Sequence, residues 1–107
     1  MRGDLVTVAV NGDFGQPRPA LIIQSDSFAG LATVTVLLVT SAIVDAPLLR
    51  ITIRPDTMNN LRKTSQIMID RVMTIKNEKV GIQFGKLDPN TMVEVERHLS
   101  IYLGITK

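Results

Sequence analysis

Cysteine and tryptophan are both absent from the 107 residues. Without cysteine the chain can form no disulfide, and it offers no thiolate as a nucleophile or metal ligand. Because only 4% of residues are aromatic, the core has to be built from Val, Ile, Leu and Met. No apolar run approaches the ~20 residues that cross a bilayer, and no basic and then apolar leader opens the chain. We therefore expect one cytoplasmic domain over residues 1–107.

Histidine occurs once, as His98. A single histidine excludes a two-histidine acid–base ribonuclease and an HExxH metal site. His98 follows Glu94 by four residues in a predicted helix, where such a pair is typically a solvated surface contact. The ten carboxylates are spread along the chain without metal-ligand spacing, and the phosphate-loop, GxGxxG and GxSxG motifs are missing. An enzyme with this sequence is expected to work without a metal or cofactor, using Arg, Asp, Thr or Ser.

The two signs of charge are unevenly distributed, although the formal net charge is only +2. Residues 48–79 carry seven lysines and arginines against three carboxylates, whereas residues 88–102 carry one arginine against three carboxylates. A basic middle segment of this kind predicts a face suited to a polyanion. Solvating charge scattered over the surface fits the composition equally well.

Short β-rich segments make up most of the chain, and they lack the intervening helices that a parallel sheet requires. We predict strands at residues 5–10, 18–25, 33–40, 48–53, 65–75 and 80–87. In the fourth, Leu49, Ile51 and Ile53 alternate with polar residues, and the fifth is expected to bulge near Arg71. These segments predict a mainly β (α+β) protein, with a small, strongly bent antiparallel sheet or barrel and one packed helix.

The helix is predicted at the end of the chain. Asp88 can cap it by accepting a hydrogen bond from a free backbone N–H, and Pro89 suits the first turn, where no donor is needed. Gly104 can end it in a left-handed conformation. One apolar stripe at helical spacing is expected to pack on the sheet. Its members are Met92, Val95, Leu99 and Tyr102.

Arg18 stands between two prolines, at the point where a polar loop becomes a strand. Pro17 and Pro19 stiffen the backbone, and the second of them disfavours helix at Arg18 itself. A stiff extended entry fixes where the guanidinium points, and its planar fork suits two phosphate oxygens. The alternative is an ion pair with a loop carboxylate such as Asp13, and the sequence leaves both readings open.

Two further polar pairs end or interrupt apolar strands. Thr40 and Ser41 follow "TVTVLLV", and their hydroxyls can hydrogen-bond a phosphate or satisfy the turn's own backbone. Asp70 and Arg71 interrupt "QIMIDRVMTI", where half-buried charges need partners. They fit either an internal ion pair with the basic segment or an acid–base group beside an arginine. Spacing alone does not decide between these alternatives.

Taken in order, several of these blocks resemble the MazF/PemK/Kid toxins. The matching blocks are "RGD" (2–4), "RPALIIQSD" (18–26), "TVTVLLVTS" (33–41), "MIDRVMTI" (68–75) and the tail at 80–105. The resemblance implies the CcdB/PemK-like fold, a small antiparallel SH3-like barrel with a C-terminal helix, assembled as a two-fold homodimer. It also implies a toxin of a toxin–antitoxin system. Such a toxin is a metal-independent endoribonuclease that cuts single-stranded mRNA at short sequences through 2′-hydroxyl attack, and its partner is a MazE-like antitoxin.

The resemblance also assigns roles to individual residues. Arg18 matches the arginine assigned to the scissile phosphate, Thr40 the threonine that completes that site, and Asp70 an acidic position with a base or positioning role in some members. RNA contacts are expected from Ser41, Phe14 and Arg71. Met68 stands where some relatives have arginine, and the loop at 11–17 is short and lacks histidine, so the general acid is not assigned.

Two other hypotheses compete with the ribonuclease. The CcdB toxins share the fold and poison DNA gyrase through a Trp-Gly-Ile ending, but this chain has Leu103 in place of tryptophan before Gly104 and Ile105, and two residues follow. The third hypothesis is a catalytically inactive barrel that only binds nucleic acid or an antitoxin.

Overall fold

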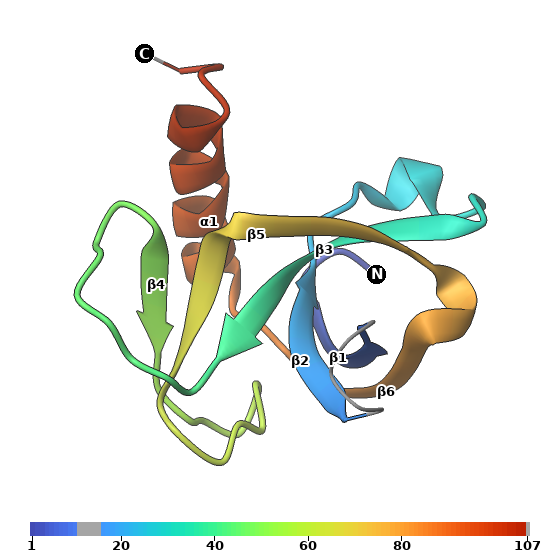
Figure 1. The fold of residues 1–107 in the computed structure, drawn as a ribbon, viewed down its shortest axis with the longest axis horizontal. Helices are drawn as coiled ribbons and strands as arrows, with labels where there is room; N and C mark the ends of the chain where they lie inside the picture. Colours follow the sequence, from blue (N-terminus) through green and yellow to red (C-terminus); the bar gives the residue numbers. More distant parts are fainter. Residues whose placement is uncertain (11–15, 107) are drawn as a thin grey trace.

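The computed structural model describes residues 1–10 and 16–106 (Figure 1). Over these residues the chain forms a mainly β structure that ends in one α-helix. The strands are β1 (Asp4–Ala9), β2 (Pro17–Ile22), β3 (Thr33–Thr40), β4 (Arg50–Ile53), β5 (Ser65–Lys76) and β6 (Val80–Lys86). Two short 3-10 turns, η1 (Asp26–Phe28) and η2 (Asn77–Lys79), and the helix α1 (Pro89–Tyr102) complete the elements.

The six strands form one antiparallel sheet in the order β4-β5-β3-β2-β1-β6. The sheet curls strongly, so that β5, η2, β6 and β1 trace an arc on one side of the molecule, with α1 standing at the other side (Figure 1). All six predicted strands are therefore confirmed, with shifts at their ends. β2 stops at Ile22, before the predicted residue 25, because Ser25 instead caps η1 by accepting from the Ser27 N–H.

A large bulge divides β5 into two halves. Leu37 pairs with Val72 and Val39 pairs with Ile67, so four residues of β5 lie opposite the single residue Leu38. Extra residues on one strand bend it and increase its twist, and Figure 1 shows β5 turning a corner at this place. The predicted bulge near Arg71 is confirmed, and it separates a buried first half of β5 from an exposed second half.

Apolar side chains form one core on each face of the sheet. The helix-side core lies under α1, whose Val95 is fully buried in it, and it combines Leu5, Leu21, Leu37, Val39, Ile53, Ile67, Ile69, Leu87 and Val95. The second core occupies the opposite face and consists of Val6, Val8, Ala20, Ile22, Val36, Leu38 and Met68. The strands alternate between these two sets because successive side chains of a strand point to opposite faces.

The helix begins and ends as predicted. Asp88 accepts from the Thr91 N–H at 3.0 Å, Pro89 occupies the first turn, and Gly104 has a left-handed φ of 74°. Met92 and Leu99 pack against the helix-side core together with Val95. Tyr102 does not, since it is 49% exposed: α1 extends beyond the sheet (Figure 1), so its last turn has nothing to pack on. No described helix is long and apolar enough to span a membrane.

Candidate active site

Arg18 and Thr40 come to the same edge of the sheet on neighbouring strands. The β2–β3 pairing ends where Ala20 lies opposite Leu38. Arg18 is two residues beyond Ala20 on β2, and Thr40 is two residues beyond Leu38 on β3. Arg18 lies two residues from Ala20, and Thr40 lies two residues from Leu38, so both point to the same face as these members of the second core. Each is partly buried. The two residues that the resemblance assigns to the scissile phosphate therefore lie on neighbouring strands and on the same face, next to the last pair of the β2–β3 ladder.

The Thr40 hydroxyl closes the turn that follows β3. It accepts from the Ala42 N–H at 3.1 Å, which is the turn interpretation considered above. A hydroxyl that accepts one hydrogen bond keeps its own proton for donation. Thr40 can therefore hold the turn and donate to a phosphate oxygen at the same time. Ser41 is exposed on the next residue.

Asp70 and Arg71 lie in the bulge of β5, opposite Leu38. Both are exposed, and neither forms an ion pair within residues 1–10 and 16–106. The internal ion pair considered from the sequence is therefore wrong, because the bulge turns these residues toward solvent instead of burying them in a regular strand. Since Leu38 is two residues before Thr40, the bulge adjoins the strand end that carries Thr40.

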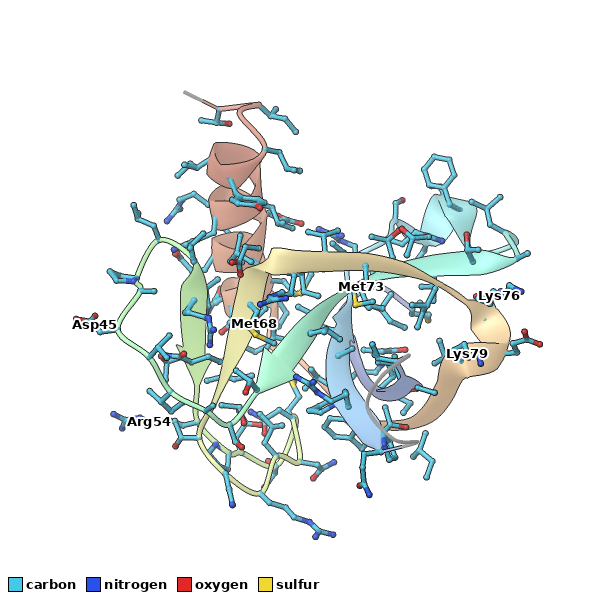
Figure 2. All side chains as sticks on the ribbon, in the orientation of Figure 1. Asp45, Arg54, Met68, Met73, Lys76 and Lys79 are labelled. Atoms are coloured by element: carbon cyan, nitrogen blue, oxygen red, sulfur yellow. The ribbon has the colours of Figure 1, made fainter. Side chains whose placement is uncertain are left out.

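Phe14, the remaining expected RNA contact, lies outside the described residues. The cations of the basic middle segment do not gather in one place. Arg54 projects beyond the end of β4, whereas Lys76 and Lys79 lie around η2 on the opposite side of the molecule (Figure 2). For these residues the structure supports scattered solvating charge.

Gln66 was not predicted as part of a site, but it links the predicted residues to the segment after β3. It is 3% exposed, and it pairs with Thr40 on one side and with Thr52 of β4 on the other. Thr40, Gln66 and Thr52 are therefore paired in a row across three strands, and Arg18 of β2 lies on the same face next to Thr40's strand. We call these four residues the cross-strand row. The signal in the sequence was a lone amide in an apolar strand, since a buried amide needs several partners.

The segment between β3 and β4 is held at two points. Gln66 accepts from the Val44 N–H at 3.1 Å and donates through Nε2 to the Val44 carbonyl at 3.0 Å. Further along, His98 of α1 brings Nε2 to 3.2 Å from the Pro47 carbonyl oxygen and Nδ1 to 2.9 Å from the Glu94 carbonyl oxygen. The expected contact between the His98 and Glu94 side chains is wrong, because the Glu94 carboxylate instead accepts from Arg97 at 2.8 Å.

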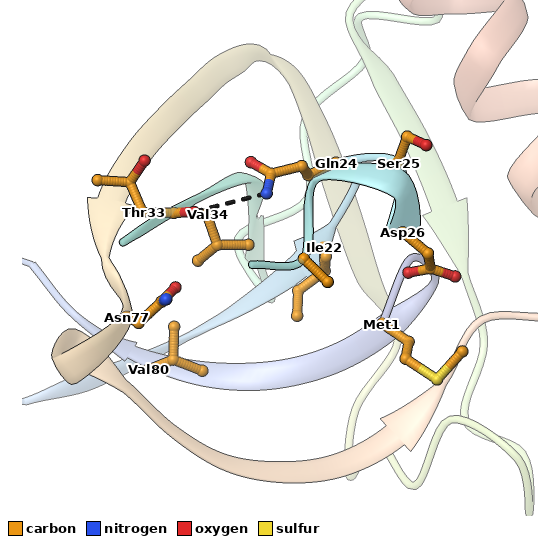
Figure 3. A pocket seen from close by; sticks show the side chains of 10 residues that line it. Met1, Ile22, Gln24, Ser25, Asp26, Thr33, Val34, Asn77 and Val80 are labelled. Atoms are coloured by element: carbon orange, nitrogen blue, oxygen red, sulfur yellow. Dashed lines mark hydrogen bonds between the residues drawn. The ribbon is translucent and has the colours of Figure 1, made fainter. Parts of the chain in front are cut away.

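A hollow of about 360 Å³ lies at the opposite edge of the sheet (Figure 3). It lies between the end of β2, the start of β3 and the start of β6, and it contains no residue of the cross-strand row. Gln24 at its rim already donates to the Phe28 carbonyl at 3.1 Å and accepts from the Thr35 N–H at 3.1 Å. Its polar groups serve the fold, so we place the candidate site at the other edge.

No three or more His, Asp or Glu side chains of the described residues lie close enough together to hold a metal ion. The polar groups of the site are instead one guanidinium, two hydroxyls, an exposed carboxylate in the neighbouring bulge and the amide of Gln66. A cation beside a hydroxyl donor suits a phosphate group, because both can donate hydrogen bonds to its oxygens.

Comparison with known proteins identifies the family. A model of the PemK-like, MazF-like toxins of type II toxin–antitoxin systems matches residues 1–103. A protein of Mycolicibacterium smegmatis described as a probable endoribonuclease MazF is 44% identical over 105 residues, covering 97% of this chain and 96% of that protein. This chain therefore belongs to the PemK-like, MazF-like toxin family. The match supports the endoribonuclease hypothesis over that of a gyrase poison.

Solved structures confirm the fold. A mycobacterial endoribonuclease in complex with its cognate antitoxin matches with a TM-score of 0.84 at 18% identity, covering 100% of this chain and 97% of that one. MazF in a MazE–MazF complex from Deinococcus radiodurans matches with a TM-score of 0.77 at 20% identity, covering 98% and 96%. The predicted CcdB/PemK-like architecture, an antiparallel sheet with a C-terminal helix, is thus confirmed.

Proposed function

We propose that this toxin cleaves single-stranded mRNA by attack of a ribose 2′-hydroxyl on the adjacent phosphorus, leaving a 2′,3′-cyclic phosphate and a 5′-hydroxyl. It is an endoribonuclease of the PemK-like, MazF-like family, and the chemistry proposed for it assigns roles to its own residues. The main support is that Arg18 and Thr40 lie on the neighbouring strands β2 and β3, on one face of the sheet, each two residues beyond the last pair, Ala20 and Leu38.

Arg18 stabilises the negative charge that builds up on the phosphorane oxygens. A guanidinium is always charged and presents its donors in a planar fork, so it can bind two of these oxygens without giving up a proton. Thr40 donates to the same phosphate and fixes its orientation. Preorganised donors of this kind lower the barrier because they need no rearrangement as the charge develops.

Asp70 is assigned as the base, or as the group that positions the attacking 2′-hydroxyl. Its support is its exposure in the β5 bulge beside the strand end that carries Thr40. Arg71 next to it, Ser41 after Thr40, and Phe14 are assigned to RNA contacts. The attacking oxygen loses its proton to the base as its bond to phosphorus forms. The 5′-oxygen of the next nucleotide leaves and takes up a proton.

The reaction is proposed to need no metal ion. The supporting observation comes from the sequence, which offers one histidine, no cysteine and carboxylates without ligand spacing. In-line attack by a neighbouring hydroxyl requires orientation and charge stabilisation, and Arg18 and Thr40 can supply these.

The proposed partners are a second copy of this chain and a MazE-like antitoxin. One similar structure is described as an endoribonuclease in complex with its cognate antitoxin and another as MazE–MazF, which supports the antitoxin. Exposed apolar side chains at the end of α1 support an assembly larger than one chain. They are Ile101, Tyr102, Leu103 and Ile105.

The experiment is to incubate the purified protein with mixed-sequence RNA in EDTA and to analyse both ends at each cut. We expect 2′,3′-cyclic phosphates and 5′-hydroxyls at a short recurring sequence. Cleavage that appears only when a divalent ion is added, or 5′-phosphate ends, would overturn the chemistry. The matched control is Arg18→Ala, which should cut the RNA about 10²–10³ times more slowly.

A further inference from the structure

A small hollow adjoins the far end of the cross-strand row. It lies between the β3–β4 segment and the face of β4, has a volume of about 190 Å³, and is lined by Val44, Asp45, Ala46, Pro47, Arg50, Thr52 and Gln66. Pockets that bury a drug-sized ligand usually measure about 300–1,000 Å³. This hollow is smaller, so it suits one planar ring better than a whole nucleotide.

The hollow is preformed, because its walls are tied to the sheet. Besides its two bonds to Val44, Gln66 donates to the Thr52 hydroxyl at 3.1 Å and accepts from Arg50 Nη1 at 3.2 Å. The same Nη1 points to the Ala42 carbonyl at 3.5 Å. The Ala46 carbonyl accepts from the N–H groups of Leu49 and Arg50 at 2.9 Å each, which closes the turn above the hollow.

The remaining polar atoms of the lining side chains of β4 are donors. Arg50 uses only Nη1, and its Nε and Nη2 make no hydrogen bond to any described residue. The Thr52 oxygen accepts from Gln66, so its proton is free to be donated. The Asp45 side chain extends outward from the segment, away from the sheet (Figure 2). A ligand here therefore meets a guanidinium edge and a hydroxyl, both able to donate.

We propose that this hollow is a base-recognition subsite that takes a keto base, guanine or uracil, of the RNA being cut. An arginine fork binds two acceptors best, as on the O6 and N7 edge of guanine, and the O4 of uracil is also an acceptor. The amino groups of adenine and cytosine are hydrogen-bond donors, so they would face the donors of Arg50 and Thr52 and form no hydrogen bond with them. This inference rests on the proposed ribonuclease function and adds a determinant of which sequence is cut.

The position fits a base close to the scissile phosphate. Thr40 pairs with Gln66, and Gln66 pairs with Thr52, so two strand spacings of about 4.8 Å each separate the hollow from Thr40, roughly 10 Å in all. The phosphate on Arg18 and Thr40 and the base on Arg50 and Thr52 thus belong to nearby nucleotides of one strand running across the sheet.

The test compares Arg50→Gln and Arg50→Lys with the matched control Arg54→Gln, since Arg54 is exposed beyond the end of β4. Each protein is given a pool of RNA oligonucleotides with randomised positions, and the cut products are sequenced. We expect the wild type to prefer a keto base at one fixed distance from the cut. In both Arg50 variants the preference for a keto base at that position should fall about tenfold, while the preferences at other positions stay unchanged. Arg50→Lys keeps the charge but not the fork.

Binding measurements separate this inference from the proposed function. The Arg18→Ala protein is titrated with two oligonucleotides that differ only in guanine or adenine at the selected position, with and without Arg50→Gln. A preference for guanine that Arg50→Gln removes supports the subsite, even if the wild type does not cut RNA. An unchanged cut pattern and unchanged binding preference in both Arg50 variants, with thermal midpoints like the wild type, would overturn it. If the Arg50 variants melt early, Thr52→Val gives the same readout.

Discussion

The two faces of the sheet differ in what covers them. The face under α1 is closed, and its side chains Leu5, Leu37 and Val95 are fully buried. The other face carries the second core, but at one edge this gives way to the polar cross-strand row from Arg18 to Thr52. One face therefore supplies much of the stability, and the edge of the other carries the residues to which the proposed chemistry is assigned. Substitutions should therefore separate into those that unfold the protein and those that only inactivate it.

The largest expected effect is on the closed face. Leu37→Ala removes a fully buried side chain and leaves a cavity, so the free energy of unfolding should fall by about 2–5 kcal/mol. The control is Leu48→Ala, where the side chain is 73% exposed and the change should stay within about 0.5 kcal/mol. Urea denaturation measures both. Equal losses in the two variants would contradict the division of the sheet.

Arg18→Ala is expected to have nearly as large an effect, but on the rate. Removing one preorganised donor costs about 10²–10³ in kcat, while the urea midpoint should stay close to that of the wild type. Single-turnover cleavage of one oligonucleotide measures it. A variant that cuts normally would remove Arg18 from the reaction centre, and one that fails to fold would place Arg18 among the structural residues.

Asp70→Asn tests the role of the β5 bulge. A general base contributes roughly 10²-fold or more, so kcat should fall by about that factor while KM changes little. Its neighbour provides the contrast, since Arg71→Gln should raise KM and lower the salt dependence of binding by about one unit of slope, with kcat unchanged. If both variants change only KM, Asp70 contacts RNA and another residue is the general base.

Thr40→Val is expected to have a smaller effect. A hydrogen bond to a charged group contributes about 1.5–3 kcal/mol, and its loss should slow cleavage accordingly. Thr40→Ser keeps the hydroxyl and should retain most of the rate. Because the hydroxyl also accepts from the Ala42 N–H, thermal melting of both variants is needed to separate catalysis from closure of the turn.

The smallest effect is expected at the start of α1. Asp88→Ala removes the cap and should cost about 1 kcal/mol at pH 7. Hydrogen bonds from the Thr91 hydroxyl and N–H hold the pKa of Asp88 below its ordinary value of 3.8. The ionised cap therefore stabilises the fold fully above pH 3.8, and this stabilisation is lost as the pH falls through the lowered pKa.

Denaturation at pH 7 and again in acid measures this change. The difference in the free energy of unfolding between wild type and Asp88→Ala should be smaller in acid than at pH 7. Asp88→Asn, a neutral cap, should differ from Asp88→Ala by the same amount at both pH values. A difference between wild type and Asp88→Ala that is the same at both pH values would show that the ionised carboxylate is not what stabilises the helix.

The strands and the helix could be predicted from the sequence because their signals are local. Alternation identified β4, and Asp88 with Pro89 identified the start of α1. Tyr102 was misplaced because a helical stripe says nothing about how far the sheet extends beneath it. One of the two alternatives left open at Asp70, an internal ion pair, is wrong for a related reason, since a bulge changes which side chains face solvent.

The site could be predicted only in part. Arg18 stood out because prolines flank it, and Thr40 because it ends an apolar strand. That they lie on neighbouring strands and on one face depends on the β2–β3 pairing, which neither segment specifies alone. Gln66 carries no local signal beyond its polarity. Its role arises from three neighbouring elements, β3, β4 and the segment between them, so it emerged only once the strands were paired.

The most direct test of the reaction centre is a double-mutant cycle on Arg18 and Thr40. Single-turnover cleavage is measured for Arg18→Ala, Thr40→Val and the double variant. If the two side chains hold one phosphate together, the double variant should be scarcely slower than Arg18→Ala alone, because residues that act as a unit are not additive. Losses that simply multiply would show that the two residues act independently, and would contradict a shared site at this edge of the sheet.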